Sequence, residues 1–255
     1  MSSTDWNAAV YDVISDPMFT WGMALLSTIE LRGHERVMDA GCGSGRLTEE
    51  LARRLPSGRV IALDSSAQML QQTRQRLGDR VDYVQASLEN FQLSAPVDGI
   101  FSNAVLHWVP DHAAMFRTLH RALRAGGWLI AQFGGKGNLA HTYERMEQAA
   151  REERFRGYIG QFEAGPHFEG VESTRARMEA AGFRVNEAKM HTEAPRFDDR
   201  ERFRSFIGTV ILRQPLARLP EPLRAEYLEA VLRRTFDEQG SYALDYVRLT
   251  VRAIA

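Results

Sequence analysis

The sequence has little of what would cross-link a protein or hold it in a membrane. Cys42 is the single cysteine among 255 residues, which excludes an internal disulfide and a metal cluster built on cysteines. No apolar run approaches the roughly eighteen residues that a membrane-spanning helix needs. The first residues are polar and lack the cationic and apolar segments of a secretory signal. We therefore expect a soluble protein of the cytoplasm.

An excess of charge of one sign is also missing. The chain has 32 lysines and arginines and 33 aspartates and glutamates, which gives a net charge of −1. Because no block of basic residues is present, we expect neither nucleic acid nor an anionic membrane as a partner. Hydrophobic residues make up 44% of the sequence, which is enough for a packed core and excludes wholesale disorder.

Strand and helix patterns alternate along the first half of the chain. Short apolar runs predict strands at 36–40, 59–63, 81–86, 97–102 and 128–133. Helical spacing predicts helices at 46–55, at 66–77, and from Asp111 to the closing glycines Gly126 and Gly127. Strands that alternate with helices form βαβ units with right-handed crossovers. We therefore predict an α/β fold with a mostly parallel sheet.

The second half of the chain is mainly helical. The patterns predict helices at 137–156, 173–181, 199–213 and 221–238, a strand at 183–190, and a strand at 242–254 that returns to a sheet edge. No linker is visible, so we expect residues 1–255 to form one domain. Its parts would be a cofactor-binding core at about 30–135, helices at about 137–170 and 198–240 that form a cap over the substrate, and the final strand.

A glycine-rich loop follows the first predicted strand. Gly41, Gly43 and Gly45 form a G-x-G-x-G pattern where a strand ends and a helix begins, at the sheet edge where open α/β folds bind ligands. A dinucleotide-binding loop would need glycine in place of Arg46, and a phosphate-binding loop would need Gly-Lys-Ser/Thr. A tight turn that only packs is the alternative interpretation of this loop taken alone.

An acidic residue on the next strand favours a ligand over simple packing. Asp64 follows Asp39 by 25 residues and lies at the tip of the adjacent predicted strand. A carboxylate there can accept hydrogen bonds from both hydroxyls of a ribose. Taken alone, Asp64 could instead cap the following helix, as Ser65 or Ser66 could. The pairing with the glycine loop favours ribose binding.

Five segments of the chain resemble the class I S-adenosylmethionine-dependent methyltransferases. They are DAGCGSGRLTEEL, ALDSSAQML, VQASLENF, VDGIFSNAVLHWVPD and LHRALRAGGWLIAQF, in the family's order, within residues 36–133. The resemblance implies a Rossmann-like, doubly wound sheet of seven strands, mostly parallel with the last strand antiparallel. Weaker motifs near Trp6, Tyr11 and His107 and at the end of the chain resemble trans-aconitate methyltransferase-like proteins, some of which methylate small carboxylic acids.

The resemblance also implies a cofactor, S-adenosyl-L-methionine, which would leave as S-adenosyl-L-homocysteine. Asp39, Gly41 and Gly43 would cradle its methionine and ribose parts. Gly45 would shape the turn, and Asp64 would bind the ribose hydroxyls.

The other implied cofactor contacts come from the following loops. Four residues would lie near the adenine, namely Ser65, Met69, Ser87 and Leu88. Asn103 and Ala104 would offer backbone groups to the methionine amine and face the sulfonium. One departure concerns Ser87, because the family commonly has an acidic residue after the third strand.

The chemistry is an in-line displacement, so the protein must align the acceptor atom with the C–S bond and exclude water. A carboxylate attacks unaided at neutral pH, whereas a phenol, hydroxyl or amine needs a base, for which His107 is the candidate. Trp108 would wall the pocket and Tyr11 would cover the cofactor, although packing alone is the alternative for all three. We expect no metal, because no acidic cluster has the spacing of a ligand set.

The late helices should form the acceptor pocket. Its candidate residues are Tyr143, Met146, Phe162, His167, Phe168, Phe203, Phe206, Ile207 and Val210, with Arg202, Arg204 and Arg213 as candidate partners of an acidic substrate. We therefore expect a small-molecule acceptor and O-methylation of a carboxylic acid by a monomer or homodimer. Other hypotheses are a phenol, hydroxyl or amine acceptor with His107 as base, a non-catalytic cofactor-binding module, and a nucleotide-dependent oxidoreductase, which Arg46 disfavours.

Overall fold

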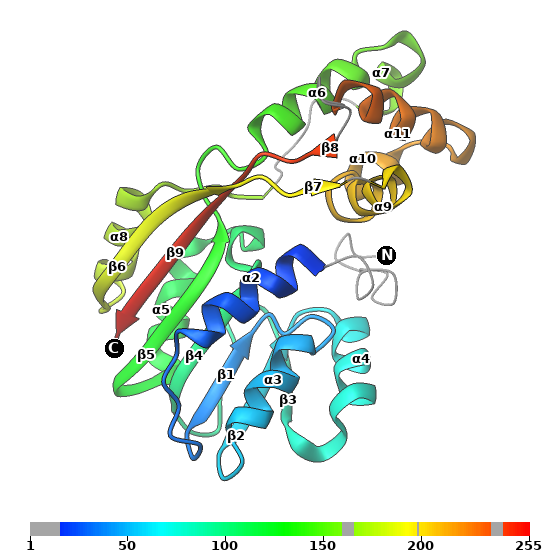
Figure 1. Ribbon diagram of the computed structural model, residues 1–255. Coiled ribbons are helices and arrows are strands. Elements are labelled where there is room, and N and C mark those ends of the chain that lie inside the picture. The colour runs from blue at the N-terminus through cyan, green and yellow to red at the C-terminus, as the bar shows by residue number, and fades with distance from the viewer. Residues whose placement is uncertain (1–15, 160–165, 198, 236–241) are drawn as a thin grey trace.

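The structure is a computed structural model that describes residues 16–159, 166–197, 199–235 and 242–255. Seven of its strands form one sheet in the order β3-β2-β1-β4-β5-β9-β6 (Figure 1). They are β1 Arg36–Ala40, β2 Arg59–Asp64, β3 Asp82–Gln85, β4 Val97–Asn103, β5 Leu123–Gly134, β6 Arg184–Glu193 and β9 Tyr246–Ile254. Pairs among β1 to β5 are parallel, and β9 runs antiparallel to both of its neighbours. The predicted seven-stranded, mostly parallel α/β sheet is confirmed.

The position of the last strand differs from the expectation. We expected an edge strand, but β9 lies between β5 and β6, so that β6 forms the edge. Arg248 is paired with Gly134 on one side and with His191 on the other. Residues 242–243, expected in the same strand, form β8 Tyr242–Ala243, which pairs with β7 Arg196–Phe197 in a separate ribbon.

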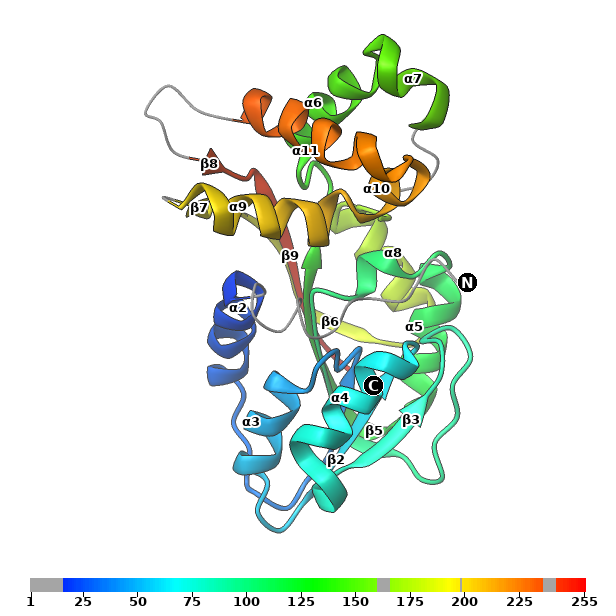
Figure 2. The ribbon, with the colours of Figure 1, turned by 90° about the vertical axis from the view of Figure 1, so that its right-hand side faces the viewer.

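Helices cover both faces of the sheet, as a doubly wound fold requires. One face carries α2 Asp16–Ser27, α3 Arg46–Arg54 and α4 Ala67–Leu77, and the other carries α5 His112–Ala122 and α8 Val171–Ala180 (Figures 1 and 2). Successive strand residues point to opposite faces. Val37 therefore joins the apolar cluster beneath α2, α3 and α4, and Met38 joins the one beneath α5 and α8.

The end of α5 also differs from the expectation. The helix ends at Ala122, and Gly126 and Gly127, which we expected to close it, lie inside β5. The register of β5 on β4 shifts just before Gly99 pairs with Trp128. The two glycines occupy this bulge, where Gly126 has a φ of +74° that favours glycine.

The cap helices lie beyond the carboxyl ends of the parallel strands, at the top of Figures 1 and 2. They are α6 Ala140–Ala150, α7 Glu153–Ile159, α9 Arg200–Phe206, α10 Arg213–Arg218 and α11 Glu221–Thr235. They enclose their own apolar cluster, which includes Phe155, Phe203 and Tyr227 and also Met18 of α2. The single helix expected at 199–213 is interrupted, because a π-helical turn, Ile207–Ile211, separates α9 from α10. No helix within the described ranges is both long and apolar enough to cross a bilayer.

Candidate cofactor and acceptor site

A cavity of about 810 Å³ lies at the carboxyl ends of the parallel strands, beneath the cap helices. Sequence-predicted residues in its lining are Asp39, Gly41, Gly43, Asp64, Ser65, Met69, Ser87, Leu88, Asn103, Ala104, His107 and Trp108. Gly45, which we grouped with the cofactor-binding residues, does not line the cavity, because its place is behind the loop against Thr73. Tyr11 lies outside the described residues. The fold therefore brings most of the predicted residues to one place.

The three glycines of the loop are required for different reasons, although all have positive φ. A Cβ at Gly41 would come within 2.4 Å of Val105, and one at Gly45 within 2.7 Å of Thr73, so close packing excludes side chains there. A Cβ at Gly43 would meet nothing within 4 Å and would project into the cavity. Gly43 is therefore the glycine that leaves room for a ligand.

Asp64 connects the end of β2 to this loop. One carboxylate oxygen accepts a hydrogen bond from the Gly43 N–H and the other from the Ser66 N–H, each at 2.9 Å. Burial raises the pKa of Asp64, while these N–H groups oppose the rise. Ser66, rather than Ser65, caps α4 by accepting from the Met69 N–H at 3.3 Å. A carboxylate has about four acceptor sites, so Asp64 can still accept from a ligand in the cavity.

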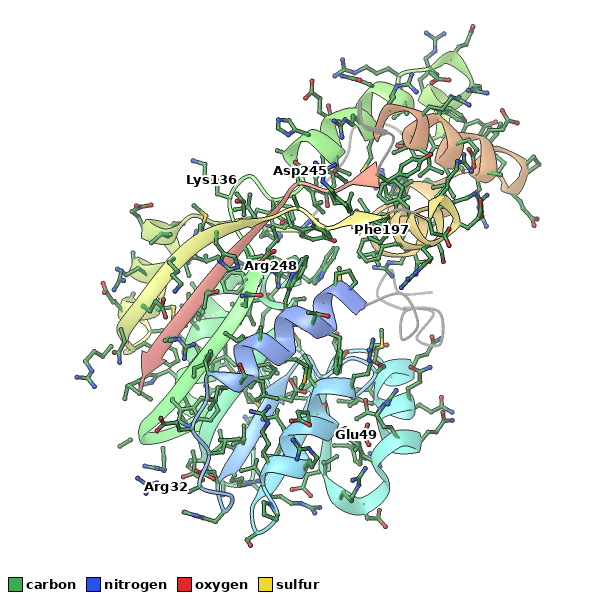
Figure 3. The ribbon with its side chains drawn as sticks, viewed as in Figure 1. Arg32, Glu49, Lys136, Phe197, Asp245 and Arg248 are labelled. Carbon is green, nitrogen blue, oxygen red and sulfur yellow. The ribbon has the colours of Figure 1, made fainter. Side chains whose placement is uncertain are left out.

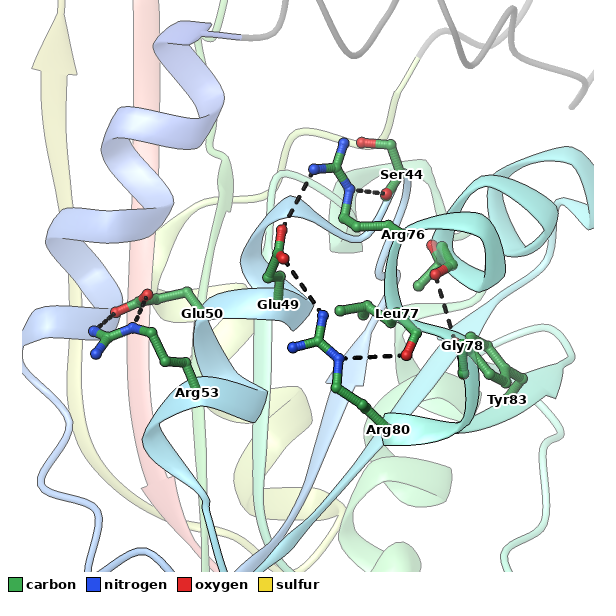
Figure 4. Close-up of polar contacts among 10 residues, drawn as sticks. Ser44, Glu49, Glu50, Arg53, Arg76, Leu77, Gly78, Arg80 and Tyr83 are labelled. Atoms are coloured by element: carbon green, nitrogen blue, oxygen red, sulfur yellow. Dashed lines mark hydrogen bonds and ion pairs between the residues drawn. The ribbon is translucent and has the colours of Figure 1, made fainter.

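Charged side chains behind the loop fix it to two helices (Figure 4). Arg76 of α4 donates from Nε to the Ser44 carbonyl at 3.2 Å and pairs with Glu49 of α3 at 3.4 Å. Arg80 approaches the same Glu49 carboxylate at 3.4 Å. Partly exposed ion pairs add little stability, but these set the position of the loop relative to α3 and α4.

Asp39, at the end of β1, is a buried acid. Its carboxylate accepts a hydrogen bond from the Thr48 hydroxyl at 2.7 Å. Burial raises the pKa of Asp39 to about 7, and the nearby Asp64 adds to the rise. Asp39 therefore changes its charge near neutral pH, and a cation bound beside it would favour the ionised form.

Asn103 is the last residue of β4, and Ala104 follows it. The Asn103 amide donates to the Met18 carbonyl at 2.9 Å, and its buried Oδ1 has no hydrogen-bond partner among the described residues. Ala104 has a φ of +61° and donates from its N–H to the Gln132 carbonyl at 2.7 Å. Strained backbone of this kind clusters at functional sites.

Glu89 is an acid that the sequence analysis did not single out. The Ser87 hydroxyl donates to one of its carboxylate oxygens at 3.0 Å, and the Asp111 N–H donates to the other at 2.9 Å. Glu89 also lines the cavity. Glu89 stands two residues after Ser87, the position where the resemblance leads one to expect an acid. The signal was present in VQASLENF.

His107 is buried, and its surroundings keep it neutral. Its Nδ1 accepts a hydrogen bond from the Gly134 N–H at 3.2 Å, so the ring proton is on Nε2. Burial lowers the pKa of His107 well below its usual value, and the nearby Arg248 adds to this. Phe168 stacks on the ring with centroids 5.6 Å apart, and Trp108, at 5.1 Å, is partly exposed. His107 therefore has no free lone pair and little basicity.

The acceptor side of the cavity differs in part from the expectation. His167, Phe168 and Val210 line it. Tyr143 packs against Phe168, and Phe162 is outside the described residues. The other expected pocket residues lie in the apolar cluster of the cap helices, namely Met146, Phe203, Phe206 and Ile207.

The structure also differs in part from the expectation that three arginines lie near the acceptor. Arg204 pairs with Glu229 at 3.1 Å, and Arg202 is exposed on the outer side of α9, so neither lines the cavity. Arg213 does line it. Arg248, which the sequence analysis passed over, lines it from β9. No group of three or more His, Cys, Asp or Glu side chains within the described part of the chain is arranged to hold a metal ion.

Comparison with known proteins agrees with this geometry. Residues 37–127 match the family described as a methyltransferase domain. A trans-aconitate 2-methyltransferase of Azoarcus sp. (strain BH72) is 42% identical over 127 residues, 50% of each chain. Another, from Afipia carboxidovorans, is 37% identical over 153 residues, 60% of this chain and 59% of that one. The solved S-adenosylmethionine-dependent methyltransferase of Mesorhizobium loti has a TM-score of 0.55 and 22% identity, covering 94% of this chain and 99% of its own.

The chain has the fold of solved S-adenosylmethionine-dependent methyltransferases, and its residues 37–127 match the model of a methyltransferase domain. Within that class, the two relatives named above are trans-aconitate 2-methyltransferases. The matched segments span 50% and 59% of the length of these relatives.

Proposed function

We propose that the protein is an S-adenosylmethionine-dependent methyltransferase that acts on a small molecule, with a carboxylate oxygen as the acceptor atom. The observation that supports it best is a set of acceptor groups on residues that line the cavity. These are the carboxylates of Asp39 and Asp64 and the buried Oδ1 of Asn103, which has no partner among the described residues. Each carboxylate has acceptor sites beyond the hydrogen bonds named above, and buried acceptors such as the Asn103 Oδ1 are normally satisfied, so this set fits a ligand rich in donors.

The cofactor matches that donor pattern in three places. Asp64 would accept from its ribose hydroxyls, and Asp39 and Asn103 would accept from its methionine amine. Glu89 and Ser87 would lie near the adenine. When bound, the cofactor supplies a methyl group on a positively charged sulfur. The chain would hold the acceptor oxygen within about 3–3.5 Å of that methyl carbon, in line with the C–S bond, and exclude water.

The state of His107 favours a carboxylate over an acceptor that must lose a proton. A general base needs a free lone pair and a pKa near the working pH. In His107 the Gly134 N–H occupies Nδ1, and burial lowers the pKa. A carboxylate is already ionised at pH 7 and needs no base. The names of the two relatives, which denote methylation of trans-aconitate, support the same choice.

Isothermal titration calorimetry with S-adenosylhomocysteine tests the cofactor assignment. We expect the wild type to bind, and Asp64→Ala to bind about 30-fold more weakly or worse, because charged hydrogen bonds are lost. Gly43→Val should abolish binding. The control is Asp82→Ala, which removes an acid of the neighbouring strand β3 that pairs with Arg59 at 2.6 Å outside the cavity. Absence of binding by a folded wild type would overturn the proposal.

Mass spectrometry of the products tests the acceptor assignment. We expect a monomethyl ester of trans-aconitate and one equivalent of S-adenosylhomocysteine. A methylated phenol or amine, with no ester, would favour the alternative acceptor class. Cofactor binding without product from any acid, phenol or amine would indicate a non-catalytic binding module.

A further inference from the structure

Leu139 has a backbone conformation that leucine rarely adopts. Its φ is +57° and its ψ is +26°, in the left-handed region that favours glycine or asparagine. Among the non-glycine residues that the structure describes, only Leu139 and Ala104 have positive φ, and both line the cavity. Strained backbone of this kind persists where the surrounding structure enforces it, and it clusters at functional sites.

The start of helix α6 does not require a leucine at this position. Leu139 directly precedes α6, where serine, threonine, asparagine, aspartate or glycine is preferred. The cap is supplied instead by Asp245, which lies between β8 and β9 (Figure 3) and accepts from the His141 and Thr142 N–H groups at 2.7 and 3.2 Å. The gain that offsets the strain therefore comes from what the leucine side chain contacts.

The Leu139 side chain belongs to an apolar wall of the cavity. The other members of this wall are Phe168, Val210 and Ile211, and all four residues line the cavity. Leu139 and Ile211 are also buried in the apolar cluster of the cap helices, against which Val210 packs. The start of α6, the segment before α8 and the π-helical turn thus each contribute apolar surface to the cavity.

Tyr143 connects Phe168 to the rest of the wall. Its N–H donates to the Leu139 carbonyl at 2.8 Å, and its ring centroid lies 6.2 Å from that of Phe168. Tyr143 also packs against the apolar cluster, and burial raises the pKa of its hydroxyl to about 12. The wall is therefore backed by surroundings of low polarity.

The wall begins beside the place where an acceptor would meet the methyl group. Phe168 stacks on His107, with ring centroids 5.6 Å apart, and His107 comes three residues after Ala104, which should face the sulfonium. All four wall residues lie outside residues 37–127, the part of the chain that matches the methyltransferase domain. The wall therefore belongs to the acceptor side of the cavity.

We infer that this wall binds an apolar substituent of the acceptor, so that the preferred acceptor is a carboxylic acid with an aliphatic or aromatic group of several carbons. This inference rests on the proposed function, and it adds a feature that trans-aconitate lacks. Removal of apolar ligand surface from water favours binding in proportion to the area buried. The apolar group would orient the carboxylate in line with the methyl carbon. An oxygen–carbon bond then forms, the carbon–sulfur bond breaks, and the sulfur keeps its electron pair.

Calorimetry on the protein saturated with S-adenosylhomocysteine compares succinate with butylsuccinate, which differ only in the apolar chain. We expect wild type to bind butylsuccinate about 10-fold more tightly or better, because each buried methylene contributes to binding. Formation of the monomethyl esters should follow the same order in kcat/KM, mostly through KM. Leu139→Ala and Val210→Thr should each reduce the preference about threefold or more and leave the affinity for succinate within about twofold.

The control is Leu228→Ala. Leu228 is buried in the same apolar cluster but does not line the cavity, so its truncation should leave the preference unchanged. Binding of S-adenosylhomocysteine by each variant reports whether the cofactor site is intact, and where a variant does not fold the wild-type comparison decides.

Equal binding of the two acids by wild type, an unchanged preference in both cavity variants, or the same loss in Leu228→Ala would overturn this inference alone. A wild type that binds the cofactor but neither binds nor esterifies any acid, trans-aconitate included, would overturn the carboxylate acceptor of the proposed function, and this inference with it.

Discussion

Asp39 and Asp64 stand near the tips of neighbouring strands, and the charge of Asp64 helps to raise the pKa of Asp39. The cavity thus holds two acids that are dehydrated before any ligand arrives. Such pairs are common at sites that bind cations, because a cation relieves the repulsion. The methionine end of the cofactor carries an ammonium group and a sulfonium, which fits that requirement.

The raised pKa of Asp39 predicts a pH-dependent stability. Its pKa is about 7 in the folded protein against an ordinary value of 3.8, so the folded state holds a proton that the unfolded chain releases. The stability from this proton is fully present below about pH 4 and is lost as the pH rises through about 7. The Asp39→Asn side chain can still accept a hydrogen bond from Thr48 but takes up no proton. The free energy of unfolding of this variant should therefore lack the dependence on pH that comes from Asp39.

Urea unfolding at several pH values between 5 and 7.5 measures the effect. The free energy of unfolding should fall more steeply with pH in the wild type than in Asp39→Asn, by on the order of 1–3 kcal/mol over that range. Equal slopes in the two proteins would show that Asp39 is ionised in the folded state at pH 5.

His107→Asn tests the assignment of His107 as a neutral, supporting residue. The asparagine oxygen can replace Nδ1 as acceptor for the Gly134 N–H, but the side chain cannot take a proton. We expect kcat for trans-aconitate within about threefold of wild type and no change in its pH profile between 6 and 8. A general base would cost about 10²–10⁴ in rate, so a loss of that size would restore the alternative acceptor class.

At the residue scale, most of the residues expected at the cofactor line the cavity, whereas only some of those expected at the acceptor do. The glycine loop and Asp64 have a fixed spacing because a βα turn and the tip of the next strand hold a ligand together. Arg248 gave no such signal, since an arginine in an alternating strand is typical of a solvent-facing position. Its burial also depends on α2, whose Trp21 ring packs against the guanidinium.

At the scale of elements, the π-helical turn Ile207–Ile211 sets which residues of the cap helices face the cavity. A π turn is an α-helix with one residue inserted, and it often occurs at functional sites. Phe203 and Phe206, before the turn, pack in the apolar cluster and do not line the cavity, whereas Val210 and Ile211 contact that cluster and also line the cavity, as does Arg213 after the turn. The turn therefore allows this segment of the cap helices both to pack in the apolar cluster and to line the cavity.

Deletion of Gly208 tests the role of this turn. Without the extra residue, the segment after it should rotate by about 100° relative to α9. We expect cofactor affinity to stay within about twofold, while kcat/KM for trans-aconitate falls about tenfold or more. Gly208→Ala is the control, because its Cβ would make ordinary contact with Leu228 at 3.5 Å. A deletion variant with wild-type turnover would exclude this role.

Most elements could be predicted from sequence, because their limits come from local patterns. The strands β1 and β2 and the helix α4 agree with the periodic patterns within a residue or so. The errors at Gly126, in the 199–213 helix and in the place of β9 have a different origin. A bulge, a π turn and a strand order all depend on partners far away in the chain.

At the scale of the whole molecule, the sheet and the cap helices share apolar contacts. Met18 of α2 and Tyr246 of β9 are buried in the same cluster as Phe203 and Tyr227. The cavity is also lined from both parts. A ligand in it should therefore stabilise the molecule as one unit, in line with the expectation of a single domain.

Differential scanning calorimetry tests this expectation. S-adenosylhomocysteine at about 100 times its dissociation constant should add about 2.7 kcal/mol to the free energy of unfolding and raise Tm by about 5–10 °C. We expect a single unfolding transition whose midpoint temperature rises with the ligand. NAD, as the control ligand, should leave that temperature unchanged. Two transitions, of which one alone moves, would show that the cap helices unfold independently.

The place of β9 in the sheet also dictates an order of assembly. Within the described sheet, β6 pairs with β9 and with no other strand, although β6 comes earlier in the chain. β6 therefore cannot join the sheet until β9 has paired with β5. Such long-range pairing forms slowly because a long loop must close first. The parallel strands that carry the glycine loop and Asp64 do not depend on this pairing, whereas the wall that carries Arg248 is complete only once β9 has joined β5.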